Sequence, residues 1–129
     1  MMDNSIGIIS KKIQNLLGIS IDGDANIYLG YSNVTHMKTS HPDDFRKYSD
    51  EIKNILSYPD YVGINKKDNS IEFVKEYKIN NEFVKVAVRV SLNNRYFARS
   101  LYILKNNRVN NFIKNGTLKK VWFYIIFEL

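Results

Sequence analysis

Two runs of alternating apolar residues on either side of Asn93-Asn94 constrain the fold of this 129-residue chain most strongly. The runs lie within residues 82–105, are rich in Val, Ile, Phe and Tyr, and predict a β-hairpin with a tight turn. With Asn93 and Asn94 as turn residues, one face pairs Val84 with Ile103, Val86 with Leu101, Val88 with Arg99 and Val90 with Phe97. The other pairs Lys85 with Tyr102, Ala87 with Ser100, Arg89 with Ala98 and Ser91 with Tyr96. A bulge or an odd loop would turn one strand's side chains over.

The first face is mostly apolar and should pack against the core, whereas the second carries cations, hydroxyls and phenols. The second face is typical of a phosphate-binding surface, and its candidate residues are Lys85, Arg89 and Ser100, with Tyr96 and Tyr102 as stacking platforms for unpaired bases. The alternative is an ordinary solvated sheet face. Arg99 falls on the predicted core face, so either that face is incompletely covered or Arg99 belongs to a site.

Charge is distributed unevenly along the chain. Residues 1–60 carry six Lys and Arg against eight Asp and Glu, a net charge of −2, whereas residues 61–129 carry thirteen against five, a net of +8. A cationic half favours a polyanionic partner such as RNA, DNA or an anionic membrane, although a generically basic surface gives the same charge. Membrane binding is the weakest of these because no basic amphipathic helix is evident.

Several classes of protein are disfavoured. The chain has no cysteine, which excludes disulfides and thiolate metal sites, and its two histidines are too few for a zinc site without carboxylates. We therefore expect neither metal nor cofactor.

The first residues lack the pattern of a signal peptide, and the apolar residues 121–127 are too few to span a bilayer. We expect a cytoplasmic site of action, with residues 121–127 in a buried strand.

The remaining periodicity predicts an α+β domain spanning residues 1–129, with helices packed on one face of an antiparallel sheet. Helices are predicted over residues 10–17, 33–39, 42–57 and 106–115, the third beginning at Pro42. Strands are predicted twice within residues 19–30, over residues 71–77, in the hairpin and over residues 117–127.

His36 and His41 are the only side chains that ordinarily titrate near neutral pH, and they flank a junction between two predicted helices. Two imidazoles near a phosphate can serve as base and acid when the 2′-hydroxyl of RNA attacks its own phosphodiester. The alternative is that His41 only caps the helix that begins at Pro42 and that His36 is a surface residue.

Five motifs occur in a characteristic order. They are His36-x-x-x-x-His41-Pro42, the segment Asn-Ile-Leu-Ser-Tyr-Pro-Asp-Tyr-Val-Gly-Ile-Asn at 54–65, a strand with Glu72 and Lys75, Tyr96-Phe-Ala-Arg-Ser-Leu-Tyr102, and Asn107-Arg108-Val-x-x-Phe-Ile-x-x-Gly116-Thr-Leu-Lys119. In combination they resemble the phage-type branch of the nuclease superfamily that groups barnase, EndoU, the colicin tRNases and RelE (BECR). The resemblance covers about residues 26–121.

The resemblance implies N-terminal helices packed on one face of a four-stranded antiparallel sheet whose open face holds RNA. It implies a metal-independent endoribonuclease, often a toxin that cleaves tRNA or mRNA, leaving here a 2′,3′-cyclic phosphate. Carried across, His36 and His41 fall at histidine positions and Ser100 at a hydroxyl position, with Lys85, Arg89 and Arg99 as cations. Such a phage-encoded or delivered toxin would need an acidic immunity or antitoxin protein to match the cationic half. The alternative is a non-catalytic RNA-binding or phage-associated interaction module that keeps the same fold.

Overall fold

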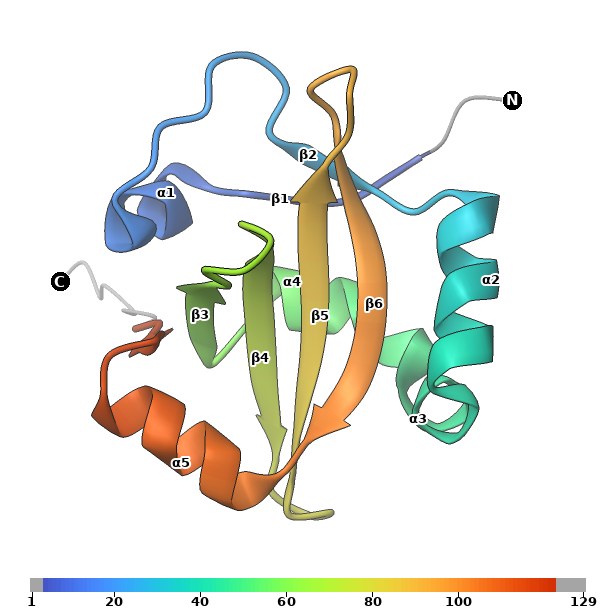
Figure 1. The fold of residues 1–129 in the computed structure, drawn as a ribbon, viewed down its shortest axis with the longest axis vertical. Coiled ribbons are helices and arrows are strands. Elements are labelled where there is room, and N and C mark those ends of the chain that lie inside the picture. Colours follow the sequence, from blue (N-terminus) through green and yellow to red (C-terminus); the bar gives the residue numbers. More distant parts are fainter. Residues whose placement is uncertain (1–3, 123–129) are drawn as a thin grey trace, which may run out of the picture.

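One mixed, curled β-sheet organises the protein (Figure 1). A computed structural model describes residues 4–122. Within that range the strands are β1 (Ser5–Ile8), β2 (Asn26–Tyr28), β3 (Tyr61–Ile64), β4 (Ile71–Tyr77), β5 (Glu82–Val90), β6 (Tyr96–Leu104) and β7 (Leu118–Lys120), in the order β1-β2-β6-β5-β4-β3-β7. The helices are α1 (Lys11–Leu17), α2 (Tyr31–Ser40), α3 (Pro42–Tyr48), a 3₁₀ turn η1 (Ser49–Glu51), α4 (Ile52–Ser57) and α5 (Asn106–Lys114).

The predicted four-stranded antiparallel sheet with helices on one face is wrong. Residues 4–122 form seven strands, and β2 runs parallel to β6, with Tyr28 opposite Phe97. The missed or shortened strands β1, β2 and β7 have only three or four residues each. So few residues carry too little alternation to identify a strand, and the pairing partner decides their conformation instead.

The helices lie on both faces of the sheet. The main core joins one face to α1, α2, α3 and α4, and its members include Ile13, Met37, Tyr48, Ile55 and Val86. On the opposite face, Val109 and Phe112 of α5 pack against Val74, Phe83 and Leu104. Helix α5 therefore covers only one end of the second face, and the rest of that face contains the candidate site described below.

The predicted hairpin register is confirmed from Val84–Ile103 to Ala87–Ser100, and beyond Ala87 it is wrong by one residue. Val88 lies opposite Ala98, so Arg99 is the extra residue of a β-bulge. Ala98 is 0% exposed in the core position, whereas Arg99 is exposed. The bulge thus removes a charge from the core, where burying it unpaired would be costly.

The turn of the hairpin also differs from the prediction. In place of a two-residue turn, the chain forms a wider loop in which the Ser91 N–H donates to the Arg95 carbonyl at 2.7 Å. Asn94 occupies the left-handed region at φ 59°, which asparagine tolerates better than most residues.

Other predicted elements are confirmed in part. Helix α1 begins after Ser10, whose hydroxyl accepts from the Ile13 N–H, and ends at Gly18 with φ 71°. The predicted helix over residues 42–57 is divided into α3, η1 and α4, and residues 19–30 form only β2. Of the predicted strand over residues 117–127, only β7 forms within the described chain, and residues 123–127 lie outside it.

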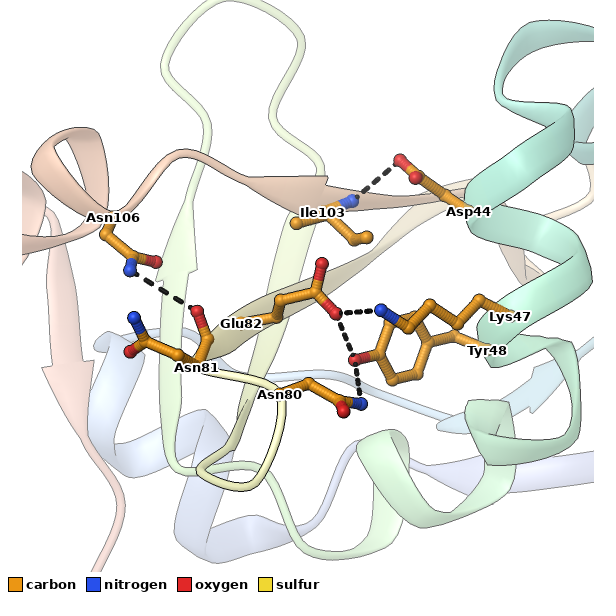
Figure 2. A network of polar contacts seen from close by, with 8 residues as sticks. All are labelled: Asp44, Lys47, Tyr48, Asn80, Asn81, Glu82, Ile103 and Asn106. Atoms are coloured by element: carbon orange, nitrogen blue, oxygen red, sulfur yellow. Dashed lines mark hydrogen bonds and ion pairs between the residues drawn. The ribbon is translucent and has the colours of Figure 1, made fainter.

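Polar contacts fasten α3 to β5 and β6 (Figure 2). The Glu82 carboxylate accepts from the Lys47 ammonium at 2.6 Å and from the Tyr48 hydroxyl at 2.7 Å. The Asp44 carboxylate accepts from the Ile103 N–H at 3.0 Å. These contacts fix the junction of α2 and α3, where His41 is located, relative to β6.

No helix in the described part of the chain is long and apolar enough to cross a membrane.

Candidate functional site

A cleft of about 700 Å³ opens at the N-terminus of α2, where this helix lies beside β6. It is lined by Gly30, Tyr31, Ser32, Asn33, His36, Phe97 and Arg99. The parallel pairing of β2 with β6 places the start of α2 against Phe97, because only Leu29 and Gly30 separate the two elements. His36 follows Ser32 by four residues, so both lie on the cleft side of the helix.

Arg99 reaches the cleft because of the bulge in β6. Its guanidinium makes no hydrogen bond, ion pair or ring contact with any residue between 4 and 122. An exposed guanidinium that lacks a carboxylate partner is suited to bind a phosphate. His36 is also exposed, and the Ser40 hydroxyl lies 3.3 and 3.4 Å from its two ring nitrogens.

His41 belongs to a second group of side chains on the same strand. Its ring stacks on the Tyr102 ring with centroids 4.7 Å apart and an interplanar angle of 25°. The Lys85 ammonium lies 4.5 Å from the centre of the Tyr102 ring. Tyr102 therefore contacts two of the candidate side chains, the exposed imidazole of His41 and the buried ammonium of Lys85.

Lys85 is paired with an acid rather than free. Its ammonium donates to Glu72 at 2.6 Å, and the two side chains are 8% and 9% exposed. Burial alone would lower the pKa of Lys85, but the hydrogen bonds to Glu72 and Tyr102 outweigh it and raise the pKa. Lys85 thus stays charged and its charge is balanced by Glu72. Of the three cations predicted for the site, Arg89 and Arg99 are the exposed ones.

The predicted site residues therefore form two groups. His36 lies with Arg99, and His41 lies with Tyr102 and Lys85. The two histidines line different hollows, since His41 borders a smaller one of about 210 Å³. Ser100 is half-buried between the groups, directly after Arg99.

The register shift gives two other candidates, Tyr96 and Arg89, different strand neighbours from those predicted. Tyr96 lies opposite Val90 and packs against the main core, so it does not share the predicted polar face. Arg89 is exposed and lies opposite Phe97. The sequence prediction missed Phe97, which an uninterrupted register assigns to the core. The misplaced charge of Arg99 was the one signal that pointed to the bulge.

The same prediction missed Tyr31 and Asn33. Tyr31 is 88% exposed and Asn33 is 8% exposed, and both line the cleft. Nothing in their local sequence distinguishes them from other residues in the first turn of a helix.

The two groups contain the kinds of side chain that phosphoryl transfer uses. Imidazoles can take and give protons, and an unpaired guanidinium with a neighbouring hydroxyl can stabilise a negatively charged phosphate. Among residues 4–122, no three His, Asp or Glu side chains come together as a metal-binding cluster.

Comparison with known proteins agrees with this chemistry. No curated protein and no solved structure matches the chain. One family model does match, over residues 4–111, and its description is phage-Barnase-EndoU-ColicinE5/D-RelE like nuclease3. The match includes the N-terminal strand and helix that the resemblance in the sequence left out, and it contains every residue of the two groups. The chain therefore belongs to this family of phage-type BECR nucleases.

Proposed function

We propose that the protein is an endoribonuclease that cleaves RNA without a metal ion, by attack of the 2′-hydroxyl on the adjacent phosphodiester. One arrangement carries the proposal: β6 presents Arg99, Ser100 and Tyr102 within four residues, with His36 lining the same cleft as Arg99 and His41 stacked on Tyr102. At about 3.3 Å per residue, these three positions span less than about 10 Å of strand. Along the strand, Ser100 lies between Arg99, which shares a cleft with His36, and Tyr102, on which His41 stacks, so we assign the phosphate to Ser100.

The proposed roles follow from this order. His36 takes the proton of the 2′-hydroxyl while the oxygen forms a bond to phosphorus. The bond from phosphorus to the 5′-oxygen breaks, and the protonated imidazole of His41 gives its proton to that oxygen. The products are a 2′,3′-cyclic phosphate and a free 5′-hydroxyl. Arg99 and Ser100 stabilise the charge that develops on the non-bridging oxygens, and Arg89 attracts the strand.

The biological setting belongs to the same proposal. A nuclease that acts on tRNA or mRNA in the cytoplasm would arrest growth, so the cell that makes it needs an inhibitor. The net charge of +8 on residues 61–129 supports an acidic immunity or antitoxin protein as that partner. Expression of the wild-type chain should arrest growth and expression of His36→Ala should not, whereas harmless expression of both would contradict a toxin.

The experiment that tests the activity uses purified protein, total RNA and excess EDTA, followed by analysis of the fragment ends. We expect discrete fragments that end in a cyclic phosphate, and none with His36→Ala, whose exposed position should leave the fold intact. Intact RNA with wild-type protein that still binds it at low salt would refute the nuclease and favour a non-catalytic RNA-binding module.

A further inference from the structure

The cleft beside Arg99 contains a buried amide with an unused donor. Asn33 is 8% exposed, and its Oδ1 accepts from the Gly30 N–H at 2.8 Å, which fixes the orientation of the amide. Its Nδ2 makes no hydrogen bond with any residue in the described range. That range also contains no buried side-chain nitrogen or oxygen that lacks a partner, so this Nδ2 must contact solvent. Asn33 lines the cleft, so the cleft is where a bound ligand would meet this donor.

Two aromatic rings line the same cleft. Tyr31 is 88% exposed although it stands in the first turn of α2. Phe97 lies across the cleft on β6, half-buried beside Tyr28, with ring centroids 5.9 Å apart. Aromatic rings that solvent can reach, next to a cation, are the usual platform for unpaired bases, because every base has a flat face that can stack. The cleft volume of about 700 Å³ is within the roughly 300–1,000 Å³ of small-molecule sites.

We propose that this cleft is a nucleobase subsite that selects guanine and uracil, which carry a keto oxygen at C6 and C4 respectively, over adenine and cytosine, which carry an amino group at those positions. Tyr31 and Phe97 stack on the base, and the Asn33 Nδ2 donates to its keto oxygen. Guanine and uracil present an acceptor at the position where adenine and cytosine present an amino donor. The Asn33 Oδ1 is engaged by Gly30, so the amide offers a donor and discriminates against an amino group.

The subsite rests on the proposed function in one respect: we assume that the bound base and the phosphate bound by Arg99 belong to the same nucleotide. Base selection is nevertheless a separate property of the cleft. It requires the donor of Asn33 and the ring of Tyr31, neither of which takes part in the proposed proton transfers.

The test measures the affinity of the wild-type protein for the four nucleoside 3′-monophosphates in EDTA, by titration followed with NMR. We expect GMP and UMP to bind about fivefold more tightly than AMP and CMP, the effect of one hydrogen bond. Asn33→Asp keeps the acceptor for the Gly30 N–H but replaces the donor with an acceptor, so it should abolish or reverse the preference. The new charge would repel all four phosphates alike, and the ratio of affinities therefore isolates base recognition.

A second variant tests the stacking. Tyr31→Ala should weaken all four nucleotides by about tenfold, since stacking on an aromatic ring contributes roughly 1–3 kcal/mol per base in single-strand binding proteins. Tyr58→Ala, at an exposed tyrosine outside the cleft, should leave the affinities unchanged.

The outcomes separate this inference from the proposed activity. Equal affinities for the four nucleotides, no binding of any, or a keto preference that survives Asn33→Asp would overturn the subsite even if the protein cleaves RNA. A keto preference that Asn33→Asp removes would support the subsite even if no RNA is cleaved.

Discussion

His41 and Tyr102 are stacked, with ring centroids 4.7 Å apart and an interplanar angle of 25°. His41 joins α2 to α3 at φ −141° and ψ 71°, outside helical geometry, so the helices do not fix the direction of its ring. Tyr102 comes from the middle of the sheet and is held in turn by Lys85. The sheet therefore orients the imidazole to which we assign the role of acid, and Tyr102 is a positioning residue.

Replacing Tyr102 should impair turnover more than substrate binding. We expect Tyr102→Ala to lower kcat by about 10- to 100-fold with little change in KM, because a small misplacement of an acid is costly. Tyr102→Phe keeps the ring and should stay close to wild type. The measurement is the pH dependence of kcat, in which Tyr102→Ala should alter the limb due to the acid. A Tyr102→Ala enzyme with wild-type kcat would remove the stacked pair from the mechanism.

Arg99 should account for much of the stabilisation of the developing charge. We expect Arg99→Ala to lower kcat by about 10²- to 10³-fold, the usual effect of removing one such donor, and Arg99→Lys to recover part of the loss. Arg108→Ala is the matched control, because Arg108 is exposed on α5 beside Phe112 and outside the cleft. Equal effects of the Arg99 and Arg108 changes on single-turnover cleavage would indicate only general attraction of RNA.

The pair Lys85–Glu72 should be important for stability in a way that depends on both partners. Lys85→Met leaves a buried carboxylate uncompensated and should lower the free energy of unfolding by about 3–5 kcal/mol. The double variant Lys85→Met/Glu72→Leu removes both charges and should recover most of that loss. Urea unfolding measures both effects, and additive losses in the double variant would show that the two residues are not coupled.

Glu82 should make the fold sensitive to acid. Two hydrogen bonds, the larger effect from Lys47 and the smaller from Tyr48, lower the pKa of Glu82 from its ordinary 4.5. A carboxyl whose pKa is lower in the folded state stabilises that state at pH values above its pKa in the unfolded chain. This contribution is lost as the pH falls through the pKa of the folded state. Wild-type protein should therefore lose more thermal stability below pH 4.5 than Glu82→Gln does.

Thermal melts between pH 7 and pH 3 make this comparison, with Asp22→Asn in an exposed loop as the control. Parallel losses in the wild-type and Glu82→Gln proteins would show that the contacts of Figure 2 do not carry the acid sensitivity.

The sequence predicted those strands whose pattern is long enough to be unambiguous. Residues 71–77 and the first half of the hairpin alternate over several residues, and both were predicted correctly. The short strands β1, β2 and β7 depend on hydrogen bonds from partners far away in the chain, which local periodicity does not encode. The bulge at Arg99 depends on the core that packs against β6, which the sequence of the strand does not describe. The charge of Arg99 at a predicted core position was the one indication of it.

The sequence predicted the candidate site only in part: it indicated residue types, but not the contacts between them. His36 and His41 attract notice because few side chains can transfer protons near neutral pH. The pairing of Lys85 with Glu72 follows from the register of two strands and from burial. The free donor of Asn33 depends on a hydrogen bond to Gly30 that consumes the other half of the amide, and no sequence pattern reveals it.

The most direct test of the central claim is a single-turnover assay with an RNA oligonucleotide that contains one mapped cleavage site, in excess EDTA. A second oligonucleotide carries a 2′-O-methyl group only on the nucleotide 5′ to the scissile phosphate. If the 2′-hydroxyl is the nucleophile, the first RNA should be cut to a 2′,3′-cyclic phosphate and the second should stay intact at that position. Cleavage of the methylated RNA at the same phosphate would contradict the proposed mechanism.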